Sequence, residues 1–371
     1  MPAYDKMPAP PAARAKIKVL IADDSALARD LLRGFLQSDG EIEVVGEARN
    51  GAEAVRLCSE LKPNIVTMDL EMPVMDGIEA ITEIMATRAV PILVVSSVAD
   101  AQKACVAVAH GALDVVAKPE IDTPSAAEFI AKVKLMSGVA VITHIRSRYA
   151  RNGEQPKPSD SAATLPAPVA AKSVPATAPL RLIVIASSTG GTKALAFILQ
   201  KLPADFPWPI LVAQHIADGF AGGMAKWLST LSPLPVRLAH EGESILPGTV
   251  YISPSDANLA VSPHHRLTLI PRLPGEIYHP TCDVLFDSAA KVYGRRVMGI
   301  ILTGMGRDGA AGLLKIRQAG GNTLAQDEAS SIIFGMNKVA IDLGGAEKVL
   351  PLNDIPQAMC RLTRLPEGEL R

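Results

Sequence analysis

Short apolar runs alternate with amphipathic stretches of helical length along the first third of the chain. Apolar runs cover residues 17–22, 64–68, 91–95 and 113–117, with a weaker one at 42–48. Strands that alternate with helices indicate a parallel sheet covered on both faces. Five such units fill residues 17 to about 135, which is a normal size for one doubly wound domain.

The pattern breaks after this region and then resumes. Residues 151–180 are rich in proline and alanine and contain no aromatic residue, which is typical of a flexible linker. Strand-like runs return at residues 181–186, 209–213, 249–252 and 297–302. The sequence therefore predicts two doubly wound α/β domains, the second a larger three-layer Rossmann-like domain. The expected divisions are a disordered tail (1–15), a first domain (16–137), a linker (138–180) and a second domain (181–371).

Composition narrows the class of protein. Hydrophobic residues make up 48% of the 371 residues and charged residues 20%, which is ordinary for a globular protein. No apolar run is long enough to span a membrane, and the first fifteen residues lack the apolar segment of a secretory signal. We therefore expect a cytoplasmic protein. Lys and Arg (37) balance Asp and Glu (38), so no positive field attracts a nucleic acid.

The cysteine pattern argues against metal or disulfide frameworks. Four cysteines lie far apart and form no C-x-x-C pair, so a zinc ribbon, a redox motif and a disulfide scaffold are all disfavoured. All four are expected to be buried thiols.

Polar side chains follow the strands of the first domain. Asp23 and Asp24 come after the first strand, Asp69 after the third, Ser96 after the fourth and Lys118 after the fifth. An isolated aspartate there commonly caps the next helix. Several carboxylates at one sheet edge repel one another unless a hard cation or a lysine compensates them, and the whole set is difficult to explain by capping.

This segment resembles the response-regulator receiver domain through MDLEMPVMDG (68–77) and the Lys-Pro pair at 118–119. The resemblance implies that Asp69 accepts a phosphoryl group and that Ser96 and Lys118 contact its oxygens. It also implies that Mg²⁺ is bound by Asp23, Asp24, Asp69 and the backbone carbonyl of Glu71. Val115 stands where many receivers carry an aromatic switch residue, which puts that family's ring-rotation account in doubt here.

Candidate nucleophilic chemistry lies in the second domain. The run LIVIASSTGGTKAL (182–195) predicts a strand, a tight glycine turn and a helix, but it matches neither a dinucleotide fingerprint nor a P-loop. His215 and Asp308 each follow a later strand, and a hydroxyl, an imidazole and a carboxylate at neighbouring strand ends suit a catalytic triad. Taken alone, His215 is better interpreted as a structural imidazole. Ser187 rivals Ser188, but adjacent residues at a strand end point to opposite sides.

The second domain is similar to the chemotaxis protein-glutamate methylesterases, the CheB family. The matching stretches are STGGT (188–192), QH (214–215), LTGMGRDGAAG (302–312), AQDEAS (325–330) and FGM (334–336). The resemblance implies that Ser188 is the nucleophile, His215 the general base and Asp308 its orienting acid, with the Met305 backbone N–H in the oxyanion hole. The departures are Ala186 for glycine, Arg307 for asparagine, and the segment 278–281.

The resemblance also implies a function. The expected enzyme is a phosphorylation-activated serine esterase that removes methyl groups from glutamyl esters of chemoreceptors and deamidates receptor glutamines. Its partners would be those receptors and a chemotaxis histidine kinase, and only the receiver would need Mg²⁺. One rival is a transcriptional regulator, which predicts a basic helical output domain instead. The other is a decayed hydrolase that only binds receptors.

Overall fold

The computed structural model describes residues 15–119, 125–141, 181–273, 276 and 278–363. Residues 1–14 of the expected tail and 142–180 of the expected linker lie outside this range. The described residues form two compact units, each built around its own parallel sheet.

The N-terminal unit contains a five-stranded parallel sheet in the order β2-β1-β3-β4-β5. This order is that of a doubly wound sheet, with its crossover next to β1. The prediction for this region is confirmed, including the weaker second strand. The strands are β1 (Ile17–Ala22), β2 (Ile42–Ala48), β3 (Ile65–Met68), β4 (Ile92–Ser96) and β5 (Asp114–Ala117).

A helix follows each of the five strands along the chain, as the crossover connections between parallel strands require. Three of the helices begin at side-chain caps, because Ser25, Asn50 and Asp76 each accept a backbone N–H of the first turn. The caps explain why these helices begin directly after polar loops. In chain order, the helices that follow β1 to β5 are α1 (Ala26–Ser38), α2 (Gly51–Leu61), α3 (Gly77–Thr87), α4 (Ala101–Ala109) and α5 (Ser125–Ser137).

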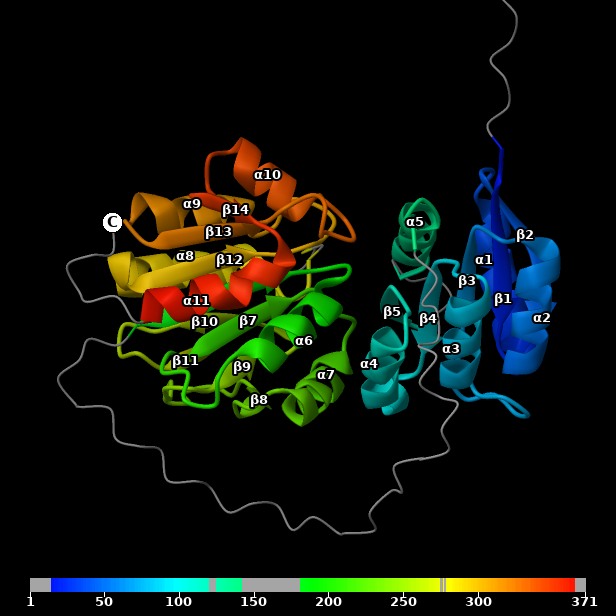
Figure 1. Ribbon diagram of the computed structural model, residues 1–371, viewed down its shortest axis with the longest axis horizontal. Helices are drawn as coiled ribbons and strands as arrows, with labels where there is room; N and C mark the ends of the chain where they lie inside the picture. Colours follow the sequence, from blue (N-terminus) through cyan, green and yellow to red (C-terminus); the bar gives the residue numbers. More distant parts are fainter. Residues whose placement is uncertain (1–14, 120–124, 142–180, 274–275, 277, 364–371) are drawn as a thin grey trace, which may run out of the picture. The chain divides into compact units, whose positions relative to one another are not determined.

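The C-terminal unit contains a seven-stranded parallel sheet in the order β14-β13-β12-β6-β7-β9-β8 (Figure 1). A separate antiparallel hairpin, β10-β11, lies beside it. The apolar runs predicted β6, β7, β9 and β12, whereas the short β8 and β14 and the more polar β13 carry a weaker signal. The strands are β6 (Leu182–Ser187), β7 (Ile210–Gln214), β8 (Val236–Leu238), β9 (Val250–Ile252), β10 (Ala257–Val261), β11 (Leu267–Pro271), β12 (Val297–Ile301), β13 (Asn322–Gln326) and β14 (Lys348–Leu350).

Both faces of this sheet are buried, as its central strand shows. In β6, Ile183 and Ile185 pack into the core beneath α6, α7 and α11, while Val184 and Ala186 pack into the core beneath α8, α9 and α10. A three-layer arrangement results (Figure 1). The helices are α6 (Gly191–Lys201), α7 (Phe220–Leu231), α8 (Cys282–Tyr293), α9 (Ala310–Gln318), α10 (Met336–Asp342) and α11 (Ile355–Thr363).

The cysteines follow the prediction with one exception. Cys58, Cys105 and Cys282 are buried, but Cys360 is partly exposed, so the expectation of four buried thiols is wrong there. Cys360 lies on α11, an amphipathic outer helix with one face toward solvent. Across the described residues, no helix combines the length and apolar character needed to cross a bilayer.

Candidate functional site

The predicted acidic residues of the N-terminal unit converge at the carboxyl ends of its strands. Asp23 follows β1 and Asp69 follows β3, and carboxylate oxygens of Asp23, Asp24 and Asp69 lie within 4.8 Å of one another. The Lys118 ammonium, just beyond β5, lies 2.8 Å from Asp23 Oδ2 and 3.2 Å from Asp69 Oδ1. The lysine offsets part of the negative charge that this convergence creates.

Burial controls the ionisation of Asp69. Desolvation raises the pKa of its carboxyl from 3.8 to about 6, the Lys118 charge acts against this shift, and the Asp23 charge adds to it. Burial alone would lower the pKa of Lys118, but its hydrogen bond to Asp23 and the charge of Asp69 raise it instead. A further positive charge beside Asp69 would therefore lower its pKa and favour the ionised carboxylate.

This cluster suits a hard divalent cation. Mg²⁺ prefers carboxylate and carbonyl oxygens, and the three carboxylates supply them. The backbone is anchored around the site, because the Arg29 guanidinium donates to the carbonyl oxygens of Asp23 and Asp24 at 2.7 and 3.0 Å. The side chain of Glu71 is exposed, which is compatible with the predicted use of its backbone carbonyl only.

Ser96 and Gly77 also contribute to the surroundings of Asp69. Ser96 Oγ is buried and has no hydrogen-bond partner in the part of the chain that the structure describes. A buried hydroxyl left unsatisfied is costly, so it favours a polar ligand beside it. Gly77 passes so close to Asp69 that a Cβ there would lie 2.1 Å from the Asp69 carbonyl oxygen. Only glycine permits this approach.

In the C-terminal unit, the two adjacent serines have different surroundings. Ser187 ends β6, is fully buried and donates from Oγ to Gln214 Oε1 at 2.6 Å. Ser188 lies just beyond the strand, where its carbonyl oxygen accepts from Gln214 Nε2 at 2.8 Å and from the Gly191 N–H at 2.7 Å. The hydroxyl of Ser187 is thus engaged in a structural hydrogen bond. The main chain of Ser188 is fixed, and its hydroxyl makes no hydrogen bond to any residue that the structure describes.

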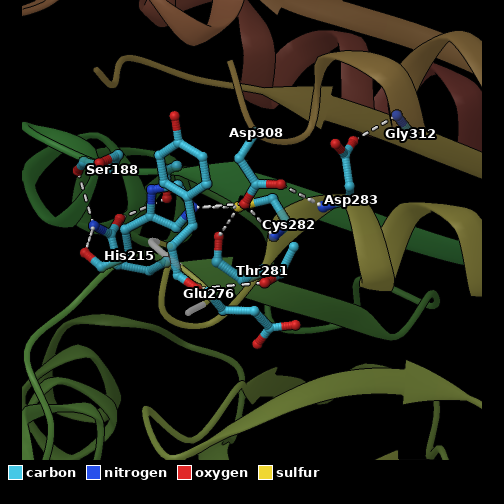
Figure 2. Close-up of polar contacts among 12 residues, drawn as sticks. Ser188, His215, Glu276, Thr281, Cys282, Asp283, Asp308 and Gly312 are labelled. Atoms are coloured by element: carbon cyan, nitrogen blue, oxygen red, sulfur yellow. Dashed lines mark hydrogen bonds and ion pairs between the residues drawn. The ribbon is translucent and has the colours of Figure 1, made fainter. Parts of the chain in front are cut away.

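His215 begins where β7 ends, next to the serines. The backbone N–H of His215 donates to the Ser187 carbonyl oxygen at 2.9 Å. The ring Nε2 lies 2.8 Å from Asp308 Oδ2. Ser188 and Asp308 lie on opposite sides of the imidazole in Figure 2. An ionised Asp308 can only accept, so Nε2 carries the proton and Nδ1 keeps its lone pair. The remaining nitrogen is the one able to take a proton from a hydroxyl.

Asp308 is held by the N-terminus of α8. Its carboxylate accepts the backbone N–H groups of Cys282 and Asp283, at 2.5 and 3.0 Å (Figure 2). Burial by itself would raise the pKa of Asp308, but the hydrogen bond from His215 and these two N–H groups outweigh it and lower the pKa. The helix thereby gains a cap from a distant segment, and the carboxylate stays ionised.

The glycine loop after β12 approaches Ser188 closely. A Cβ at Gly304 would lie 2.6 Å from Ser188 Cβ, so the close packing requires glycine. The next residue, Met305, is 45% exposed, and no described residue accepts its backbone N–H. A free N–H beside the serine is the kind of donor that stabilises an oxyanion.

Sequence reasoning missed three contributors to this site. Gln214 hydrogen-bonds to Ser187 and Ser188, Cys282 Sγ lies 3.3 Å from His215 Nε2, and Tyr278 stacks on the His215 ring with centroids 5.0 Å apart. Tyr278 lies in the segment that departs from the family pattern, and that segment does border the site. Of the other departures, Arg307 is exposed and Ala186 is buried beneath the loop.

Comparisons with known proteins agree with both resemblances. The profile described as CheB methylesterase matches residues 183–359, and the one described as response regulator receiver domain matches residues 19–128. A protein-glutamate methylesterase/protein-glutamine glutaminase of Paramagnetospirillum magneticum is 49% identical over 357 residues, covering 96% of this chain and 99% of the relative. One from Anaeromyxobacter dehalogenans is 42% identical over 353 residues, covering 94% and 97%.

Among solved structures, the CheB methylesterase catalytic domain of Thermotoga maritima is 37% identical. It covers 50% of this chain and 100% of its own length, with a TM-score of 0.49.

Proposed function

Since the chain belongs to the CheB family of protein-glutamate methylesterases/protein-glutamine glutaminases, we propose that it hydrolyses glutamyl methyl esters on chemoreceptors and deamidates receptor glutamines. The observation that carries this proposal is the 2.8 Å contact between His215 and Asp308 at the strand ends beside Ser188. The reaction belongs to the C-terminal domain, and the receiver domain regulates it.

The proposed ester hydrolysis proceeds through an acyl-enzyme. Ser188 Oγ attacks the ester carbonyl while His215 Nδ1 takes the hydroxyl proton, and Asp308 stabilises the resulting imidazolium. The Met305 N–H donates to the developing oxyanion. Methoxide leaves as methanol with the proton from His215. Water, activated by the same imidazole, then releases free glutamate, and a glutamine side chain reacts likewise with loss of ammonia.

The proposed regulatory site is Asp69, the phosphoryl acceptor. Mg²⁺, when bound by Asp23, Asp24, Asp69 and the Glu71 carbonyl, supplies positive charge that neutralises the transferring group. Lys118 and Ser96 contact the phosphoryl oxygens, the first through its ammonium and the second through its otherwise unsatisfied hydroxyl. A chemotaxis histidine kinase is the proposed phosphodonor, and phosphorylation raises the esterase rate in the cytoplasm.

Regulation is tested by measuring methanol release with and without a small phosphodonor and Mg²⁺. The expected result is a faster rate for the wild type and no change for Asp69→Asn. A phosphodonor effect that persists in Asp69→Asn would contradict the assignment of the acceptor.

The nucleophile is tested by a matched pair of substitutions. Ser188→Ala is expected to reduce methanol release from methylated receptor by roughly 10⁴-fold or more, because it removes the attacking oxygen. Ser187→Ala is expected to retain most activity, since it removes only a hydrogen bond to Gln214. Loss of activity in Ser187→Ala alone would move the nucleophile by one residue. Wild-type protein without esterase activity would favour the receptor-binding scaffold.

A further inference from the structure

A thiol lies against the histidine and aspartate of the proposed triad. Cys282 Sγ is 3.3 Å from His215 Nε2, the same nitrogen that contacts Asp308 Oδ2 at 2.8 Å. Donor atoms of His215, Cys282 and Asp308 all lie within 4.8 Å of one another. The ester hydrolysis proposed above uses no step at this thiol, so its position next to Nε2 has no role in that mechanism.

The three donors are spaced as ligands of one small ion. Zinc bonds to nitrogen and oxygen are about 2.0–2.2 Å and to sulfur about 2.3 Å, so two ligands of a tetrahedral ion lie about 3.3–3.6 Å apart. A tetrahedral ion would hold sulfur and nitrogen about 3.5 Å apart and nitrogen and oxygen about 3.4 Å apart. The observed sulfur–nitrogen distance of 3.3 Å and nitrogen–oxygen distance of 2.8 Å must therefore both open, the second by more than the first. The chemistry fits equally, since thiolate and imidazole are preferred zinc ligands.

Of the three side chains, that of His215 is the most exposed to solvent. The side chain of His215 is 11% exposed, while that of Asp308 is 2% exposed and Cys282 is fully buried. An ion that enters the site would pass the partly exposed His215 ring, since the other two side chains are buried, and would replace the hydrogen bond between His215 and Asp308. The fourth position would be filled by water, because three protein ligands are present.

We propose that His215 Nε2, Cys282 Sγ and Asp308 form a binding site for a thiophilic divalent cation, with Zn²⁺ as the reference ion, that inhibits the esterase reversibly. The binding step does not depend on the proposed function, whereas the inhibition rests on the role of His215 as the base.

The coordination chemistry explains why binding would inhibit. The Cys282 thiol loses its proton to solvent and forms a metal–sulfur bond, and Nε2 gives up its proton and forms a metal–nitrogen bond. The imidazole stays neutral by taking a proton at Nδ1, so one proton is released in total. A protonated Nδ1 cannot accept the Ser188 proton, so the chemical step stops while substrate binding is unaffected.

Binding is tested on the full chain with Cd²⁺, whose thiolate complexes absorb in the ultraviolet. We expect a thiolate-to-metal charge-transfer band that saturates at one ion per chain and is absent in both Cys282→Ala and Cys282→Val. Cys360→Ala, a cysteine substitution on α11, should retain the band. Absence of the band in the wild type, or its loss with Cys360→Ala rather than with the Cys282 variants, would overturn the site.

Inhibition is tested separately with Zn²⁺, comparing each variant with its own metal-free rate. We expect kcat of the wild type to fall by roughly a hundredfold with KM unchanged, and a chelator to restore it. Cys360→Ala should behave like the wild type, whereas Cys282→Ala and Cys282→Val should be much less sensitive. A Cd²⁺ band without Zn²⁺ inhibition would refute inhibition through His215, and equal inhibition of all variants would place the inhibitory ion elsewhere.

Discussion

The two candidate sites each place a buried aspartate beyond a parallel strand, and the two carboxyl groups reach opposite electrostatic states. Asp69 directly follows β3, while Asp308 lies in the loop between β12 and α9. Desolvation raises the pKa of Asp69 to about 6, whereas hydrogen bonds lower the pKa of Asp308 below its usual value although Asp308 is the more deeply buried. The receiver site brings carboxylates together, and the esterase site surrounds one carboxylate with donors.

Neighbouring hydrogen-bond donors, rather than burial alone, decide the charge of a buried aspartate. Asp308 receives two N–H groups from α8 and one hydrogen bond from His215, while Asp69 relies mainly on Lys118 and faces the charge of Asp23. The negative charge at Asp69 is only partly compensated, which suits the binding of Mg²⁺ and a phosphoryl group. The negative charge at Asp308 is compensated by hydrogen-bond donors, which suits the orientation of a histidine.

The largest effect is expected from removing the charge of the satisfied carboxylate. Asp308→Asn should lower kcat for ester hydrolysis by about 10⁴-fold, because a neutral amide neither fixes the His215 tautomer nor stabilises its imidazolium. Steady-state methanol release measures this. Asp287→Asn, which alters a carboxylate of α8 paired with lysines, is the control and should be nearly silent. A loss below tenfold for Asp308→Asn would contradict the proposed orientation of the base.

A second prediction concerns the unmet charge and pH. When the pH is below the Asp69 pKa of about 6, the Asp69 carboxyl holds a proton that must leave before Mg²⁺ binds. Protons therefore compete with the cation. Mg²⁺ binding by calorimetry should be about tenfold weaker at pH 5 than at pH 7. Asp30→Asn, which removes an exposed carboxylate on α1, should keep this dependence. An affinity that stays constant between these pH values would show that Asp69 ionises normally.

The same shift affects stability with a definite sign. Because the folded pKa of Asp69 lies above 3.8, the folded state binds more protons than the unfolded state between these values. The contribution of Asp69 to stability is therefore fully present below pH 4 and is lost as the pH rises through about 6.

A smaller effect is expected from the ring over the histidine. Tyr278→Ala should lower kcat roughly threefold to tenfold, since an aromatic pair contributes about 0.5–1.5 kcal/mol to holding the His215 ring. Tyr278→Phe keeps the stacked face and should recover the wild-type rate, with KM unchanged in both variants. If Tyr278→Phe is as slow as Tyr278→Ala, the phenol hydroxyl rather than the ring is required.

The smallest effect is expected one residue into α8. The Asp283 side chain accepts the Gly312 N–H at 2.6 Å, and an amide oxygen can replace it, while the backbone N–H to Asp308 is untouched. Asp283→Asn should change kcat by less than about threefold, measured beside Asp308→Asn. A loss as large as that of Asp308→Asn would mean that the charge at the helix start, and not the donors around Asp308, governs the base.

Much of the fold was predictable because buried parallel strands are nearly continuous apolar runs. The runs at β1, β3, β4, β6 and β7 were recognised for this reason, and both sheets are parallel as predicted. The edge strands β8 and β14 are three residues each, too short for periodicity to identify. Cys360 was misjudged because its exposure depends on which face of α11 packs inward.

The sequence alone determined the two α/β domains, the receiver motif and the residue types of the esterase site, because local strand and turn patterns carry that information. The sequence already favoured Ser188 over Ser187, but only the tertiary structure showed that Gln214 engages the Ser187 hydroxyl. Only the tertiary structure brought Tyr278 and Cys282 to His215 and placed Asp308 at the start of α8. These contacts join residues far apart in the chain. Their geometry depends on how strands and helices pack, and no local pattern encodes it.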